Sequence, residues 1–201
     1  DALPIFGVAL ANPAALAGSI FYAAHHITIQ GTLFLVAGLM ERVGGSTSLD
    51  RLGGLARVSP LLGALFFIPA MNLAGIPPLS GFVAKLALLQ AGVANGTLIA
   101  WALVVAGVST SLLTLYAMAK VWNRAFWGVA PESVLESARS YDSPERGRLL
   151  PPLMVGSTVG LLALALVFTF AAGPMYDYVE ASASALFDQS YITAVLPEGV
   201  R

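Results

Sequence analysis

The feature that most constrains the fold is an apolar run from Val58 to Ala94, in which Lys85 is the only ionisable side chain. A helix needs roughly 20 apolar residues to cross a bilayer, so this run can span a membrane. Hydrophobic residues make up 57% of the chain and charged residues 10%, against about 25% charged residues in soluble proteins. Such a chain cannot cover a water-facing surface, which predicts an all-α, polytopic bundle of transmembrane helices.

The run is interrupted by GIPPLSG at 75–81. Two consecutive prolines remove two main-chain donors and clash with the preceding turn, so an unbroken helix is not expected there. Two arrangements remain: a hairpin of two short spans, or one span broken near 75–81. In either case the residues that we assign to the helix break are Gly75, Pro77, Pro78 and Gly81.

The basic residues distinguish these arrangements, because Lys and Arg collect in cytoplasmic loops. If 58–94 crosses once, loops 43–57 and 120–150 lie on the same side of the membrane. Apart from Lys85 and Arg201, every lysine and arginine lies in or beside these two loops, and a hairpin would put the two basic segments on opposite sides. We therefore predict a protein of the cell's inner (plasma) membrane in which 58–94 forms one broken span. Both basic loops lie in the cytoplasm and the C-terminal tail lies outside.

Four spans are expected in all, at about 13–42, 58–94, 98–122 and 151–172. Pro174 then opens an amphipathic tail helix at about 175–187, which we expect to lie at the membrane interface. The chain begins on DALPIFGVAL, without an initiator Met, and this stretch is typical of the end of an apolar helix. We therefore expect a piece of a longer protein.

Lys85 is the first candidate for chemistry. An ionisable residue inside a span costs at least a few kcal/mol and marks a functional position by default. A helix break leaves main-chain carbonyls and amides unpaired, which is tolerable only where they line a hydrated or protein-buried cavity. Asn72 could satisfy part of that backbone. The alternative is a lysine that extends to the membrane surface, since Lys85 lies about one turn past the break.

The second candidate is the pair His25-His26 on the first span. Their side chains diverge by about 100° on a helix, so that one can face a polar axis while the other meets a neighbouring helix. Histidine can relay protons near neutral pH. Alternatively, it has a structural role alone and forms hydrogen bonds between helices. Two histidines and a lysine favour a proton relay, with five side chains that could line it or orient water: Gln30, Thr28, Ser80, Ser109 and Thr110. Ser111 and Thr114 lie on the same span as Ser109 and Thr110, and for all four the simpler interpretation is a bond to their own helix.

Other classes of function are excluded by what the sequence lacks. It has no cysteine and a net charge of −1, which argues against thiol chemistry, iron–sulfur clusters and nucleic-acid binding. No nucleotide-binding or hydrolase motif occurs, and adjacent histidines are poorly spaced for one metal ion. We expect no cofactor, no metal site and no soluble enzyme activity.

Three stretches carry a resemblance to a known family: HH-x(3)-Q-x-x-LFL-x-x-G from His25 to Gly38, SLDRLGGL at 48–55, and LAGIPPLSGFVAKLALL at 73–89. They resemble the proton-antiporter family, which comprises the antiporter-like membrane subunits of respiratory complex I and of Mrp-type Na+/H+ antiporters. LYAMAKVWNRAFWG at 115–128 and YITAVLPEG at 191–199 are most similar to the D-type subunits of Mrp antiporters. The resemblance implies that residues 1–201 form the C-terminal part of a fourteen-helix membrane domain, from its eleventh helix on.

The resemblance further implies a function. In this family buried Lys, His and Glu residues and water form a polar axis, to which Lys85, His25 and His26 correspond. Gln30 departs from the pattern, because many relatives have lysine there, and glutamine cannot hold a proton. The implied activity is H+ transport in exchange for Na+, with Mrp subunits of types A, B, C, E, F and G and the lipid bilayer as partners. The alternatives are a proton-pumping subunit of a quinone-reducing or hydrogenase complex, and a scaffold that does not transport.

Overall fold

The computed structural model describes residues 3–142 and 148–188; Arg146 and the ending 191–199 lie outside them. Every regular element in these residues is a helix, as predicted, and the order along the chain is α1 (Leu3–Ala9), α2 (Pro13–Gly44), α3 (Leu55–Val58), α4 (Pro60–Ala74), α5 (Ser80–Asn95), α6 (Leu98–Val121), α7 (Glu132–Arg139), α8 (Pro152–Phe170) and α9 (Ala172–Phe187). A π-helical turn at Trp122–Phe126 extends α6, and a 3-10 turn at Ser140–Asp142 follows α7.

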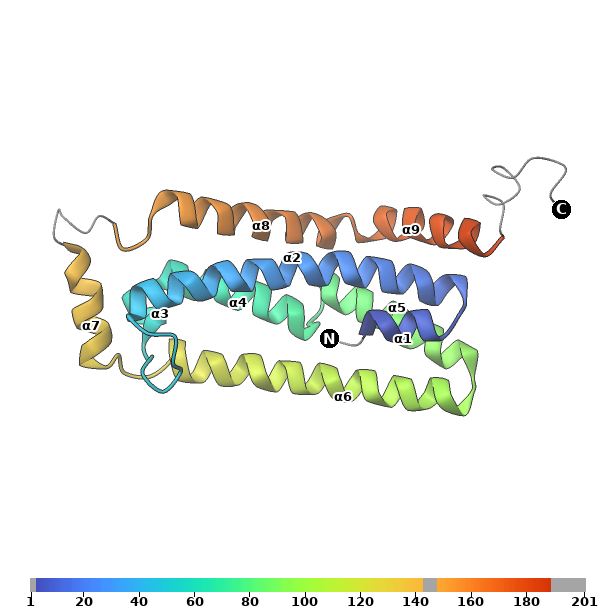
Figure 1. Ribbon diagram of the computed structural model, residues 1–201, viewed down its shortest axis with the longest axis horizontal. Coiled ribbons are helices and arrows are strands. Elements are labelled where there is room, and N and C mark those ends of the chain that lie inside the picture. Colours follow the sequence, from blue (N-terminus) through green and yellow to red (C-terminus); the bar gives the residue numbers. More distant parts are fainter. Residues whose placement is uncertain (1–2, 143–147, 189–201) are drawn as a thin grey trace, which may run out of the picture.

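Helix α2 is the central element of the bundle (Figure 1). It runs the whole length of the molecule and packs against α1, α4, α5, α8 and α9. Its start is defined by Asn12, whose side chain accepts a hydrogen bond from the N–H of Ala15, followed by Pro13 in the first turn, a position where proline is favoured. It ends at Gly45, which adopts a left-handed conformation with φ 69°. The helix is continuous, and His25 and His26 lie near its middle.

In the part of the chain that the structure describes, three helical segments are long and apolar enough to cross a membrane: Pro13–Gly44, Leu98–Phe126 and Pro152–Phe170. The run predicted as the remaining span is divided into α4 and α5, which follow one another along the bundle instead of folding back (Figure 1). Ser59 sets the start of α4, since its hydroxyl accepts from the N–H of Leu62. The non-helical residues 75–79 separate the two half-helices.

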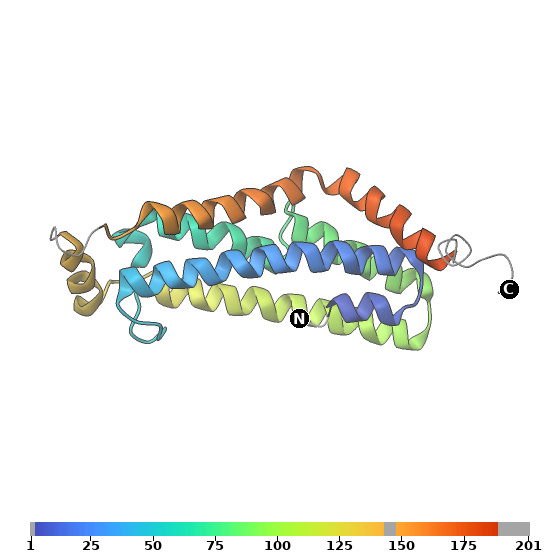
Figure 2. The same ribbon diagram turned by 45° about the horizontal axis from the view of Figure 1, so that its top comes forward.

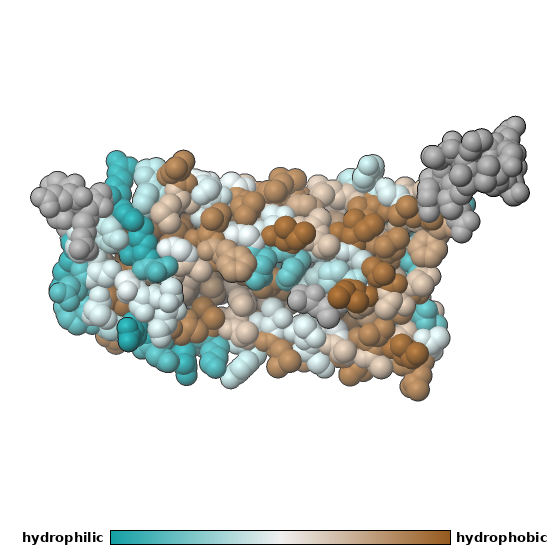
Figure 3. All heavy atoms as spheres, in the orientation of Figure 1, coloured by the Kyte–Doolittle hydropathy of each residue, from teal (hydrophilic) through white to brown (hydrophobic). Residues whose placement is uncertain are grey.

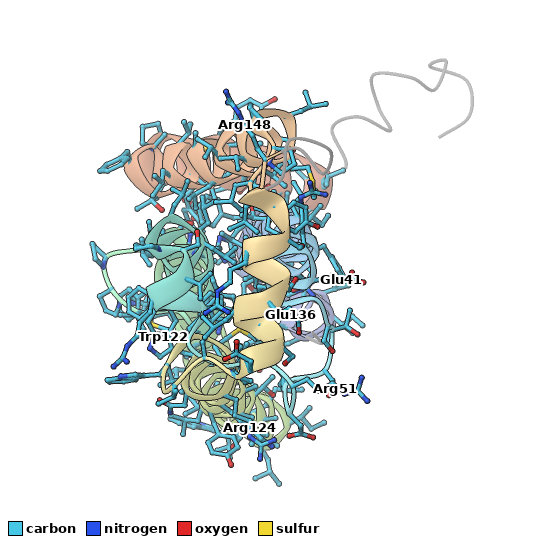
Figure 4. The ribbon with its side chains drawn as sticks, turned by 90° about the vertical axis from the view of Figure 1, so that its left-hand side faces the viewer. Glu41, Arg51, Trp122, Arg124, Glu136 and Arg148 are labelled. Carbon is cyan, nitrogen blue, oxygen red and sulfur yellow. The ribbon has the colours of Figure 1, made fainter. Side chains whose placement is uncertain are left out.

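The basic loops lie at one end of the bundle, where α7 crosses it (Figure 1). Arg42 donates to the main-chain carbonyls of Leu149 and Arg148 at 3.1 and 3.0 Å, and Arg124 pairs with Asp50 at 2.8 Å. Polar residues gather at this end, and apolar residues dominate the rest of the visible face (Figure 3). The end view shows Arg124 at the end of α6 and Arg148 near the start of α8 (Figure 4). The loops therefore share one end of the molecule.

Helices α8 and α9 meet at Ala171 with a bend (Figure 2). The tail helix begins at Ala172, so that Pro174 lies in its first turn. A proline is tolerated there because it removes no intrahelical hydrogen bond. It packs along α2, where the ring of Tyr176 meets that of Phe21 edge-on at 6.1 Å between centroids. The contact fixes α9 beside α2, and its expected place at the membrane interface stays a prediction.

Candidate functional site

The end of α4 exposes two main-chain carbonyls inside the bundle. An α-helix leaves its last four C=O groups without intrahelical partners. Gly75 has φ 85°, and its N–H and that of Ile76 bond back to the carbonyls of Met71 and Asn72 at 3.1 to 3.2 Å, the pattern of a Schellman motif. Among the described residues, the carbonyls of Leu73 and Ala74 remain without a main-chain partner.

Lys85 binds these two carbonyls. Its Nζ donates to Leu73 O at 2.9 Å and to Ala74 O at 3.1 Å, and the residue is only 6% exposed. The α4 C-terminus carries a partial negative charge, which favours a cation at this position. The side chain thus turns back toward the break and does not extend to the end of the bundle, where the alternative interpretation would place it.

The start of α5 is stabilised by side chains from two other helices. The Gly81 N–H donates to Asn72 Oδ1 at 2.9 Å, as the sequence suggested for Asn72. The Ser80 N–H donates to the Thr169 hydroxyl of α8 at 3.1 Å. Helix N-termini leave such N–H groups without backbone partners, so Asn72 and Thr169 act as caps supplied from a distance.

A buried hydrogen-bonded chain links α2 to the break. His25 Nδ1 lies 3.0 Å from Ser80 Oγ, and Ser80 Oγ lies 3.4 Å from Asn72 Oδ1; all three residues are at most 1% exposed. A serine hydroxyl has one proton to donate. If Ser80 donates to Asn72, His25 must carry a proton on Nδ1 and donate it to Ser80. If Ser80 donates to His25, the Nδ1 nitrogen is unprotonated and accepts. The tautomer of His25 and the orientation of Ser80 are therefore coupled.

The two histidines occupy different surroundings, as their divergence on the helix predicts. His25 is buried and close to the break: a Cβ added at Gly81 would collide with the Asn72 carbonyl oxygen and come within 2.9 Å of His25 Nε2. His26 is only partly buried, and its ring stacks on Tyr22 at 5.7 Å between centroids. Of the two, His25 belongs to the hydrogen-bonded chain.

Two cavities are lined by residues at the C-terminal end of α4. A cavity of about 190 Å³ adjoins Lys85, Ala74, Gly75 and Ser111 between α5 and α6. A second, of about 350 Å³, extends from Gln30 and Leu73 to Thr47. Ala74 lines the first cavity and Leu73 the second, so each cavity borders one of the two residues whose carbonyls hold Lys85.

The remaining predicted side chains lie apart from Lys85. Thr28 donates to Ala24 O within α2. Ser109 and Thr110 donate to carbonyls one turn back in α6, at 2.8 Å each, as the simpler interpretation supposed; the α6 hydroxyl beside Lys85 is that of Ser111.

A larger cavity, of about 500 Å³, lies away from the site at the polar end. It is bordered by Glu136 of α7 and by Arg51, both labelled in Figure 4, and by several serines. It shares no lining residue with the other two.

The helices of this site coincide with a family match. The family described as NADH:quinone oxidoreductase/Mrp antiporter, transmembrane region, matches residues 2–114. The chain belongs to this family. The match includes α2, α4 and α5, which supply His25, Asn72, Ser80 and Lys85. It confirms the resemblance drawn from the motifs.

The chain is also similar in sequence to individual members of this family. The D-type subunit of the Na(+)/H(+) antiporter of Alkalihalophilus pseudofirmus is 40% identical over 96% of this chain, and that of Bacillus subtilis is 37% identical over 96%. This chain spans 37% of the length of each relative. A chain in the structure of the Mrp complex from Dietzia sp. DQ12-45-1b has 31% identity and a TM-score of 0.75, over 95% of this chain and 41% of that one.

One side chain at the site of this antiporter-family chain, Thr169, is not singled out by sequence. It is a hydroxyl in an apolar helix, and α8 carries others at Ser157 and Thr158 that donate to carbonyls of their own helix. Thr169 meets Ser80 across 89 positions of sequence. Only the packing of α8 on α5 distinguishes it.

Proposed function

We propose that this chain is the C-terminal part of a D-type subunit of an Mrp Na+/H+ antiporter, and that it moves protons through His25, Ser80 and Lys85. The observation that carries the proposal is the setting of Lys85: a lysine buried at mid-bundle, bonded to two carbonyls of a broken helix. Transporters place ion and proton sites at such discontinuous helices. The exchanged ions are those in the names of the relatives.

In this proposal each residue has a definite part. His25 accepts or releases a proton, and the Ser80 hydroxyl reorients between His25 and Asn72 as it does so. Lys85 alternates between a charged form, held by Leu73 O and Ala74 O, and a neutral form that has given up its proton. The cavity beside Lys85 has room for water to complete the path. Gln30 lies outside this path.

The whole assembly is part of the proposal. The chain is placed in the plasma membrane, with loops 43–57 and 120–150 in the cytoplasm and the tail outside, beside Mrp subunits of the other types. The shared end of the two basic loops supports this orientation. Lipid would cover the apolar length of the bundle (Figure 3).

Replacement of Lys85 tests the proposal. Lys85→Ala in the full-length chain, in its intact assembly, should abolish Na+-dependent pH recovery in inverted vesicles. Lys120→Ala, at an exposed lysine near the end of α6, is the matched control and should transport normally. Wild-type transport by Lys85→Ala, at equal amounts of assembly in the membrane, would refute the proposed role and favour a scaffold.

A further inference from the structure

We infer that the carbonyls of Leu73 and Ala74 form a binding site for a hard monovalent cation, which the Lys85 ammonium occupies as a tethered competitor. The inference rests on the proposed function and names the ion site within it. A cation from solution would take the two carbonyls when Lys85 loses its proton and withdraws.

The carbonyls are suited to this use because nothing else satisfies them. Among the described residues, the Gly75 and Ile76 N–H groups bond to Met71 and Asn72, while Leu73 O and Ala74 O accept only from Lys85 Nζ. An unpaired buried carbonyl is costly. When Lys85 leaves, both oxygens therefore need another partner, either a hydrogen-bond donor such as water or a cation.

The chemistry of the ligands selects a monovalent cation. Main-chain carbonyl oxygens are hard donors that can replace the hydration shell of an alkali-metal ion, and the C-terminal ends of half-helices coordinate Na+ in transporters. Among the described residues, no carboxylate lines the cavity, and Lys85 and Ser111 are the lining residues with polar side chains. A divalent ion would lack a neutralising charge here. The Ser111 hydroxyl and water offer further oxygen ligands.

The cavity provides room beside the carbonyls. Its volume of about 190 Å³ adjoins Ala74, Gly75 and Lys85, and a water molecule occupies about 30 Å³ in the liquid. A partly hydrated ion therefore fits without displacement of the helices. Gly75 leaves space for the Lys85 side chain, because a Cβ added there would lie 2.9 Å from Lys85 Cδ.

Few other charges act on this site. Of the helices that pack on α5, α1, α4 and α8 carry no ionisable side chain. Helix α2 brings His25 and His26, which are within electrostatic reach of Lys85, together with Tyr22 and, near its far end, Glu41 and Arg42; α6 brings Tyr116 and Lys120. Lys85 itself is therefore the charge that competes with the ion, and protonated histidines would add to the same effect.

The test is equilibrium binding of 22Na+ to the purified, intact assembly from about pH 6 to about pH 10, across which histidine and lysine titrate in proteins. For one cation exchanged with one proton, the affinity of this site should rise about tenfold per pH unit while Lys85 is charged. Lys85→Met frees the carbonyls, so one Na+ should bind with little dependence on pH. Lys85→Arg keeps a permanent charge, so that Na+ should be lost at every pH. Lys120→Met is the control and should match wild type.

The two Lys85 variants shift binding in opposite directions, so a fault in folding cannot imitate the result. Unchanged Na+ binding in both would overturn the inference. If transport is lost in both while Na+ binding stays as in wild type, the proton path stands and the ion site is refuted. If both transport normally, the proposed function fails, and the binding data still decide the ion site. Repetition with 86Rb+ identifies which alkali-metal ion the site prefers.

Discussion

Asn72 Oδ1 accepts a hydrogen bond from the Gly81 N–H at 2.9 Å, so the last turn of α4 caps the first turn of α5. The same oxygen lies 3.4 Å from the Ser80 hydroxyl, which faces His25. One amide therefore holds the two half-helices together and borders the proposed proton path. Asn72 is 1% exposed, so this cap is buried.

Asn72→Ala should destabilise the assembly by about 1–3 kcal/mol, because the Gly81 N–H is then buried without an acceptor. The measurement is unfolding of the purified assembly in mixed micelles. Asn123→Ala, at an exposed asparagine after α6, should change stability by less than about 0.5 kcal/mol. Equal stability of the two variants would show that the cap has no energetic role.

Gly81→Ala should separate the half-helices, since the new methyl group collides with the Asn72 carbonyl and approaches His25. Overpacking of this kind costs about 1–3 kcal/mol. Gly160→Ala is the matched change, because nothing lies within 4 Å of a Cβ there and alanine is the better helix former. Thermal inactivation of transport should occur earlier in the first variant and no earlier in the second; the reverse order would contradict the described packing.

Ser80→Ala should slow proton transport at least about tenfold, a modest loss for a group that transfers protons. Within the described residues, the Ser80 hydroxyl is the hydrogen-bond partner of His25 Nδ1, and alanine can neither accept nor donate. Ser109→Ala is the control, because that hydroxyl is exposed and bonds Val105 O within its own helix. Proton uptake into vesicles at matched protein levels gives both rates. Wild-type uptake by Ser80→Ala would remove Ser80 from the path.

The path is further predicted to bypass Gln30. His25→Gln should lose proton transport, because glutamine has no titratable group, whereas Gln30→Leu should keep more than about a third of it. The Gln30 side chain is partly buried and lines the other cavity. Initial rates of pH recovery distinguish the two. Loss of transport in Gln30→Leu alone would place the relay in that cavity instead.

The orientation is tested by cysteine labelling, since residues 1–201 contain no cysteine. Ser48→Cys should react with an impermeant maleimide only from the cytoplasmic face, and Asn95→Cys, at the opposite end of the bundle (Figure 1), only from outside. The parent assembly without either change gives the background, and a permeant maleimide shows that both thiols are reactive. Labelling of both from one side would contradict a single crossing by α4 and α5.

Much of this arrangement can be predicted from sequence, because its causes are local. Two consecutive prolines, such as Pro77 and Pro78, interrupt the interior of a helix. Lys85 is conspicuous because the run around it is apolar. The basic loops indicate their common end through charge alone. The tail helix also follows from periodicity, although it begins at Ala172, three residues before the predicted start at about 175.

The rest depends on helix rotation and on distant contacts. Neighbouring residues of α6 differ by about 100° in direction, so composition cannot decide whether Ser109, Thr110 or Ser111 faces Lys85. Thr169 reaches Ser80 only because α8 packs beside α5. The path of the Lys85 side chain back to α4 likewise depends on which carbonyls the Gly75 cap leaves unsatisfied.

The central claim, that Lys85 must gain and lose a proton, is tested most directly by Lys85→Arg. Arginine keeps the charge and can donate to Leu73 O and Ala74 O, but it does not release its proton in proteins. The account predicts an assembly of normal abundance whose Na+-dependent proton transport in vesicles falls at least about tenfold. Transport at the wild-type rate would contradict it, because a fixed charge at position 85 would then be sufficient.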